Sequence, residues 1–231
     1  DRVLDTRTGI GVPAAKPAAG DTVSVRVTGR GGVPSTGVAA VALNATAAEA
    51  TNGGFVTAWP SGRARPDASN LNLVAPGDTA ANLVLVPVGA DGSVSLYTEQ
   101  GAHLLADVVG WFGDDSQPSS TVGLFQPLAP SRVFDTRPFD RVVDGASTTR
   151  PYAGVAGVPL GDVAAVAANV TATEAGAAGY LTAWSAGRAR PNASTLNLGG
   201  AGDTRANAAL LPLGDAGSIA HFAERGAHLV V

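Results

Sequence analysis

Two stretches of the chain combine an aromatic ring with planar hydrogen-bonding side chains, a combination suited to binding sugars. They run from Thr57 to Leu73 and from Thr182 to Leu198. In each, an apolar segment ends in Trp, a turn carries two arginines and a proline, and a second apolar segment begins. The candidate sugar-binding residues are Trp59, Arg63, Arg65, Asp67 and Asn70 in the first stretch, and Trp184, Arg188, Arg190 and Asn192 in the second.

A structural interpretation of the same stretches stays open. Trp59 is also typical of a core residue, and arginines in a turn bond to its carbonyl groups. Pro66 restricts the turn locally. The two interpretations differ in one observable: a sugar site requires Trp59 and Trp184 to face solvent, whereas a structural role permits their burial.

Other polar residues recur at equivalent places in the two halves of the chain. Asp5 and Arg7 lie two residues apart on a predicted strand and so share a face. That spacing favours an ion pair that holds the first strand, and Asp135 with Arg137 repeats it. Asparagines within apolar strands must find hydrogen-bond partners, so we interpret them as structural; they are Asn44, Asn72 and Asn82, with Asn169, Asn197 and Asn207 in the second half.

The sequence predicts neither an enzyme nor a cofactor. Glu49 and Glu99 are the only carboxylate pair that we consider for glycoside hydrolysis, but both fit turn or strand-end positions. No Gly-x-Ser-x-Gly motif supplies a nucleophile. With 3 histidines and no cysteine, the chain predicts no His- or Cys-rich metal site, and it has no Asp-x-Asp-x-Asp loop for calcium.

The composition is that of a globular protein. Of 231 residues, 45% are hydrophobic and 15% charged, with a net charge of -4. The chain has no basic stripe with interleaved aromatics, so we predict no nucleic-acid binding. It has no apolar run of about 18 residues, so we predict no membrane span.

Short apolar or alternating segments, bounded by Gly, Pro, Asp or Asn, recur along the chain. Period-two alternation, as in residues 22–28, is typical of half-buried strands. The first half therefore predicts eight strands, near residues 2–7, 22–28, 38–46, 55–59, 70–74, 81–88, 93–97 and 103–109.

The pattern then repeats. Residues 37–106 align without gaps to 162–231, and 39 of the 70 pairs are identical. We predict two homologous domains in tandem, at 1–113 and 124–231, joined by a polar linker at 114–123. The first domain continues through Ala106–Phe112 (ADVVGWF), which the second lacks. Two explanations are that the chain is part of a longer protein, or that a neighbouring protein chain supplies the last strand by strand addition.

The motif set RVLDTR, LNAT, TAWPSGRARPDASNLNL, GDTAANLVLVPVG and HLLADVVGWF resembles a repeat module of secreted and cell-surface actinobacterial proteins. The resemblance covers nearly the whole chain in two copies. It implies an extracellular or cell-surface, all-β accessory module concerned with structure, adhesion, spacing or contact with cell-wall glycans, and it supplies no catalytic residues.

We therefore predict an all-β fold of two tandem β-sandwich domains, jelly-roll or immunoglobulin-like and mainly antiparallel. The leading functional hypothesis is a non-catalytic structural, adhesive or surface-display repeat. The alternative is a carbohydrate- or cell-wall-binding module that uses the Trp/Arg turn of each repeat, with a cell-wall glycan or other polysaccharide as partner.

Overall fold

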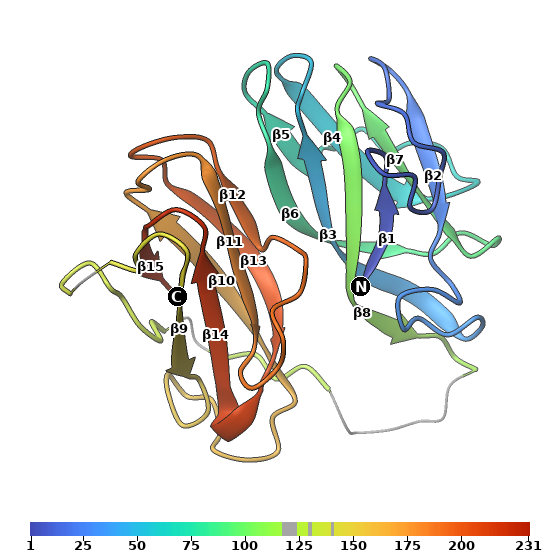
Figure 1. The fold of residues 1–231 in the computed structure, drawn as a ribbon. Coiled ribbons are helices and arrows are strands. Elements are labelled where there is room, and N and C mark those ends of the chain that lie inside the picture. Colours follow the sequence, from blue (N-terminus) through green and yellow to red (C-terminus); the bar gives the residue numbers. More distant parts are fainter. Residues whose placement is uncertain (117–123, 129–130, 140) are drawn as a thin grey trace. The chain divides into compact units, whose positions relative to one another are not determined.

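The computed structural model describes residues 1–116, 124–128, 131–139 and 141–231. Apart from one 3₁₀ turn at Asp215–Gly217, every regular element in these ranges is a β-strand (Figure 1). The predicted all-β sandwich fold is thus confirmed. The chain divides into unit 1, Asp1–Pro118, and unit 2, Ser119–Val231, and each is described on its own. Most of the predicted linker, 114–123, lies outside the described residues.

Unit 1 consists of two four-stranded antiparallel sheets, with strand orders β1-β8-β3-β6 and β2-β7-β4-β5. Every one of the eight predicted segments contains a strand. Their bounds are β1 (Arg2–Asp5), β2 (Thr22–Arg26), β3 (Val38–Ala48), β4 (Gly54–Pro60), β5 (Leu71–Leu73), β6 (Ala80–Pro87), β7 (Ser93–Thr98) and β8 (His103–Gly113).

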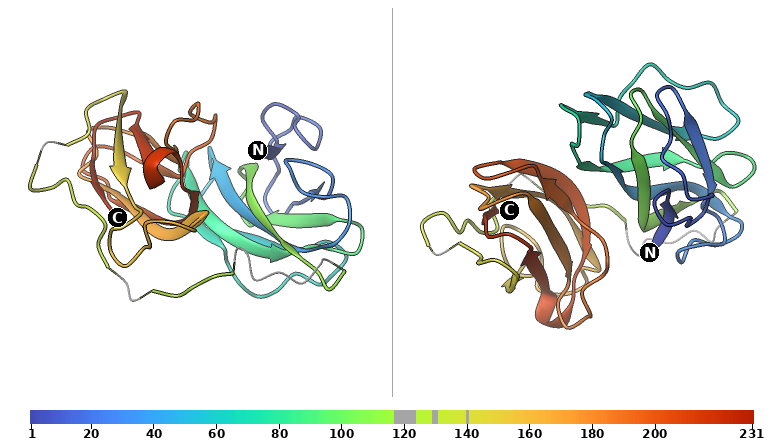
Figure 2. Two further views of the ribbon diagram at one scale, coloured as in Figure 1. Left: turned by 90° about the horizontal axis from the view of Figure 1, so that it is seen from below. Right: turned by 45° about the horizontal axis from the view of Figure 1, so that its top comes forward.

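The strand order is that of a jelly roll. β1 pairs with β8, β2 with β7, β3 with β6 and β4 with β5, as in a long hairpin that is folded over on itself. Of the two sandwich types that the sequence left open, this order selects the jelly roll. The curled sheets can be followed in two further views (Figure 2).

One apolar core lies between the two sheets of unit 1. It is lined by alternate residues, such as Val41 and Leu43 on β3 and Val94 and Leu96 on β7. Because side chains alternate between the faces of a strand, the intervening residues of β4 and β7 lie on the outer face of the second sheet. That outer face carries Trp59 and Tyr97, and neither belongs to the core cluster.

Unit 2 repeats this order, with sheets β13-β10-β15 and β12-β11-β14-β9. The bounds are β9 (Ala146–Pro151), β10 (Ala165–Thr173), β11 (Gly179–Ser185), β12 (Leu196–Leu198), β13 (Arg205–Pro212), β14 (Ser218–Ala223) and β15 (His228–Val230). The counterpart of β1 is not a named strand. It is held to β15 by a bridge from Asp135 to Val230 and by the Thr136 amide, which donates to the Leu229 carbonyl at 2.9 Å.

The units differ in how their long central strand is paired. β3 pairs with β8 from Val38 to Ala48, whereas β10 pairs with β15 only from Thr171 to Thr173. In the part of the chain that the structure describes, Ala165–Val170 therefore pair on one side only, with β13. Among these same residues, no helix has the length and apolar character needed to cross a membrane.

Candidate functional site

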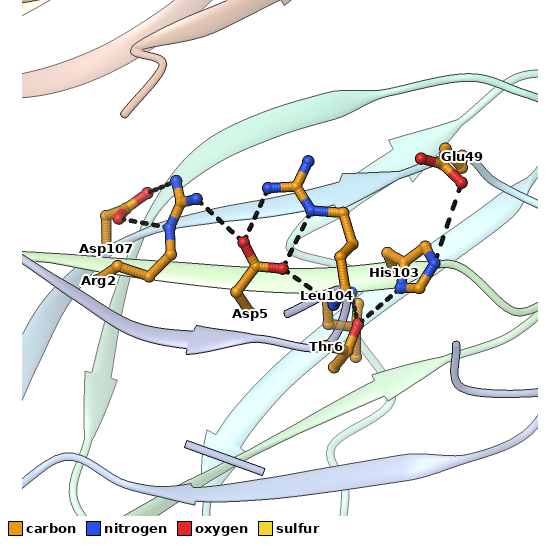
Figure 3. Close-up of polar contacts among 8 residues, drawn as sticks. Arg2, Asp5, Thr6, Glu49, His103, Leu104 and Asp107 are labelled. Atoms are coloured by element: carbon orange, nitrogen blue, oxygen red, sulfur yellow. Dashed lines mark hydrogen bonds and ion pairs between the residues drawn. The ribbon is translucent and has the colours of Figure 1, made fainter. Parts of the chain in front are cut away.

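A charged cluster joins β1 to β8 in unit 1, and Figure 3 shows its members in a row along these strands. Arg2 makes a two-pronged contact with Asp107, with Nε to Oδ1 and Nη2 to Oδ2 both at 3.0 Å. Arg2 also reaches Asp5 at 3.1 Å, and Arg7 reaches the same carboxylate at 2.8 Å. The predicted Asp5–Arg7 ion pair is present, and it extends across the sheet to Asp107.

The cluster favours the ionised form of Asp5. The side chain is 2% exposed, and burial alone opposes ionisation. Hydrogen bonds from Arg7, together with the charges of Arg7 and Arg2, outweigh that cost and hold the pKa of Asp5 below its ordinary value. Asp5 is thus a fixed anion that ties two arginines to the first strand.

Next to this cluster, a hydroxyl, an imidazole and a carboxylate form a chain of side-chain contacts. Thr6 Oγ1 lies 3.0 Å from His103 Nδ1, and His103 Nε2 lies 3.9 Å from Glu49 (Figure 3). Glu49 has a left-handed backbone, with φ of 52°, which is uncommon for a residue other than glycine. The order resembles that of a hydrolase triad.

The hydroxyl of this arrangement is unsuited to nucleophilic attack. Thr6 is 1% exposed, and its Oγ1 accepts a hydrogen bond from the Leu104 amide at 3.0 Å. A nucleophile must reach the substrate, whereas this oxygen is enclosed between β1 and β8. The arrangement instead holds the end of β1 against the neighbouring strand, β8.

Unit 2 repeats the arrangement in a more open form. Asp135 contacts Arg132 at 2.8 Å and also Arg137. Hydrogen bonds from Arg137 hold the pKa of Asp135 well below its ordinary value. Thr136 Oγ1 accepts from the Leu229 amide at 2.8 Å and lies 3.3 Å from His228 Nδ1. Glu174, the counterpart of Glu49, is also left-handed, with φ of 53°.

The residues predicted as a sugar site lie on the outer face of the second sheet of each unit. In unit 1, the turn after β4 folds back over that face. Thr57 Oγ1 donates to the Ala68 carbonyl at 2.6 Å, and the Trp59 indole N–H donates to the Arg63 carbonyl at 2.9 Å. In unit 2, Thr182 and Trp184 make the same two bonds, at 2.7 and 2.9 Å.

Trp59 is buried, at 7% exposed, but it lies outside the sandwich core. Its own turn covers it, so it offers no open ring face to a sugar. Trp184 is half-buried, and its indole N–H is occupied in the same way. The tryptophans therefore hold the turns closed.

The base of each turn is fastened by further side-chain bonds. Asn70 Oδ1 accepts from the Ala58 amide at 2.6 Å, and Asn82 Nδ2 donates to the Asn70 carbonyl at 2.6 Å. In unit 2, Thr195 takes the place of Asn70, and Asn207 donates to its carbonyl at 2.6 Å. Predicted site residue Asn70 thus has a structural contact.

The other predicted site residues are exposed; they are Arg63, Arg65, Asp67, Arg188, Arg190 and Asn192. Arg65 Cζ lies 4.0 Å from the centre of the Tyr97 ring, and Arg190 Cζ lies 3.5 Å from that of Phe222. Sequence reasoning missed both rings. Their position opposite Thr57 and Thr182 in the ladder places them on the same outer face, which alternation along β7 and β14 alone could have indicated.

Unit 2 also contains a buried polar pair that no sequence pattern pointed to. Tyr152 Oη lies 3.0 Å from His221 Nε2 in the core, and both residues are at most 1% exposed. Burial, and to a smaller extent the charge of Arg150, lowers the pKa of His221 to about 4. Burial also raises the pKa of Tyr152.

Among the described residues, no group of three or more His, Cys, Asp or Glu side chains is arranged to hold a metal ion. A scan against protein-family models finds no match to the chain, and searches of curated proteins and of solved structures find none either.

Proposed function

We propose that the chain is a non-catalytic structural, adhesive or surface-display repeat of an extracellular or cell-surface protein. One observation carries the proposal. Polar side chains that recur in both units make equivalent internal contacts in each, so duplication has preserved a set of hydrogen bonds that stabilise the fold.

The equivalence holds in both sheets. In the first sheet, the Thr6 hydroxyl accepts a hydrogen bond from a backbone amide of β8, and the Thr136 hydroxyl accepts one from a backbone amide of β15. In the second, Trp59 and Trp184 each donate to a carbonyl four residues later. Polar atoms used in this way are satisfied within the fold, whereas a catalytic group must present its reactive atom to a substrate.

The proposal is tested on cells. The 231-residue chain is placed between a wall-anchored segment and a reporter enzyme at a bacterial surface. We expect the reporter to stay accessible and the chain to resist added protease, because a folded repeat exposes little cleavable backbone. The double variant Thr6→Val/Thr136→Val should be cleaved faster, whereas Arg30→Gln, at an exposed site, should behave as the parent. Release of sugar or peptide from purified walls by the chain itself would contradict the proposal.

A second candidate function is binding of a cell-wall glycan or other polysaccharide by the arginine turns. Exposure favours it: four arginines, two in each turn, lie at the surface of the same face in the two units. For the contact with sugar, we propose these arginines in place of Trp59 and Trp184, whose indole N–H groups bond to carbonyls of their own turns.

For a protein partner, we propose strand addition beside β10. In unit 1, residues Val108–Gly113 of β8 lie along the part of β3 from Val38 to Leu43. The equivalent backbone of β10, Ala165–Ala168, has the same sheet geometry with β13. A strand with the alternation of β8 from a neighbouring chain would fit this edge.

A further inference from the structure

Each unit carries an arginine that is held against an aromatic ring on the outer face of its second sheet. Arg65 lies over Tyr97, and Arg190 lies over Phe222. Each of these rings packs against a second ring: the ring centres of Phe55 and Tyr97 lie 5.9 Å apart, and those of Tyr180 and Phe222 lie 5.8 Å apart. Contact with a ring face restricts the guanidinium and stabilises its charge.

The donors of these two guanidinium groups stay available. Six of the other arginines in the described ranges are paired with carboxylates, as Arg2 and Arg7 are. Across those same ranges, neither Arg65 nor Arg190 makes an ion pair or a side-chain hydrogen bond, and both are exposed. A guanidinium carries five N–H donors and no acceptor. Each of these two groups is therefore held in place by its ring, while its N–H donors remain open to a ligand.

A hydroxyl group accompanies each fork. On the edge strand, Thr22 of β2 pairs with Tyr97, and Ser147 of β9 pairs with Phe222. Both are exposed and share the face of the ring, because directly paired residues lie on one side of a sheet. On the outer face of its second sheet, each unit thus presents an arginine stacked on an aromatic ring, with a hydroxyl residue on the strand next to that ring.

We propose that Arg65 and Arg190 are the contact residues of two equivalent subsites for the acid groups of an acidic polysaccharide. A planar guanidinium fork matches the two oxygens of a carboxylate or phosphate better than it matches a neutral hydroxyl. Each unit carries one such subsite, so the chain offers two separate contact points to polymers with many acid groups. The inference rests on the second candidate function and specifies its ligand.

The surrounding charges make a further distinction. Asp67 stands two residues after Arg65, and Asn192 takes its place in the second turn. A carboxylate in the first turn repels an acidic ligand, so Asp67→Asn, which copies the second turn, should strengthen binding.

Three polymers test the proposal by biolayer interferometry on the full chain: polygalacturonate for carboxylates, poly(glycerol phosphate) for phosphodiesters, and dextran as the neutral sugar. We expect binding to one or both acidic polymers, weakened by salt, and none to dextran. The preferred polymer identifies the acid group. Arg65→Gln and Arg190→Gln should each weaken binding about tenfold, since each removes a charged hydrogen-bond donor, and the double variant more.

Two controls separate a built subsite from general charge. Arg30→Gln removes the same charge from another exposed site and should bind as the parent does. Tyr97→Leu keeps every charge but removes the aromatic ring on which Arg65 is stacked, and it should weaken binding. Equal losses in Arg30→Gln and Arg65→Gln would overturn the subsite.

The remaining outcomes separate this inference from the functions on which it rests. Dextran binding that is indifferent to Arg65→Gln and Arg190→Gln would overturn the acidic ligand while leaving carbohydrate binding in place. No binding to any of the three polymers would overturn the subsites, while the surface-display proposal would still be judged by the protease experiment.

Discussion

The buried His221–Tyr152 pair predicts that unit 2 loses stability in mild acid while unit 1 does not. By the register of the equivalent strands, unit 1 has Leu96 in place of His221 and Val27 in place of Tyr152. Both of those residues are fully buried and apolar. At these two positions unit 2 has titratable side chains and unit 1 has none, and of the two only His221 titrates in mild acid.

The sign follows from the pKa of His221, which is about 4 in the folded protein against an ordinary 6.5. Between these values, the unfolded chain binds a proton that the folded chain does not. The stability contributed by neutral His221 is complete above pH 6.5 and is lost as the pH falls toward 4. At 1.36 kcal/mol per pKa unit, the loss is about 3 kcal/mol, or roughly 10 °C in the melting temperature of a unit of this size.

Calorimetry of the full chain from pH 7.5 to 4.5 measures this effect. We expect the transition of unit 2 to move down and that of unit 1 to stay nearly constant. The double variant His221→Leu/Tyr152→Phe identifies the unit 2 transition and should remove its dependence on pH in this window. An unchanged unit 2 transition, or the same downward shift in the double variant, would refute the reasoning.

Three further predictions concern packing and pairing. Thr6→Val leaves the Leu104 amide without its acceptor and should destabilise unit 1 by about 2 kcal/mol, measured by urea unfolding; a change under 0.5 kcal/mol would contradict the fastening role. Gly11→Ala should cost at least about 2 kcal/mol more than Gly20→Ala in the same assay. Both glycines have φ near 80°, but a Cβ on Gly11 collides with the Val3 carbonyl and Val25, whereas one on Gly20 meets no atom; equal costs would show that the collision is relieved. A peptide with the sequence Ala106–Gly113 should bind unit 2 saturably and shift backbone NMR signals of β10, and a scrambled peptide that does the same would exclude strand addition.

Local pattern was enough to predict the strands but not their partners. Alternation and turn residues placed all eight strands of unit 1, because side chains alternate along a strand whatever it pairs with. Whether β1 pairs with β8 is a contact between residues about a hundred positions apart, and no local pattern encodes it. The sequence therefore predicted a sandwich and left the choice between jelly roll and immunoglobulin-like order open.

The candidate site shows a similar division. Duplication selected the arginine turns, and the structure places Arg63, Arg65, Arg188 and Arg190 at the surface as a site would require. The burial of Trp59 depends on the turn folding back over its own strand, through the bond from the indole to the Arg63 carbonyl. A tryptophan at the end of an apolar segment has the same local sequence whether solvent, core or its own turn covers it.

The different interiors of the two units bear on how faithfully the chain folds. Tandem domains of similar sequence are prone to exchange strands with one another during folding. A hybrid sandwich with β14 in the place of β7 would put His221 where Leu96 lies, among aliphatic neighbours and away from the Tyr152 hydroxyl. An imidazole buried without this hydroxyl partner is costly, so the pair should disfavour misassembly between two repeats that share many of their other internal hydrogen bonds.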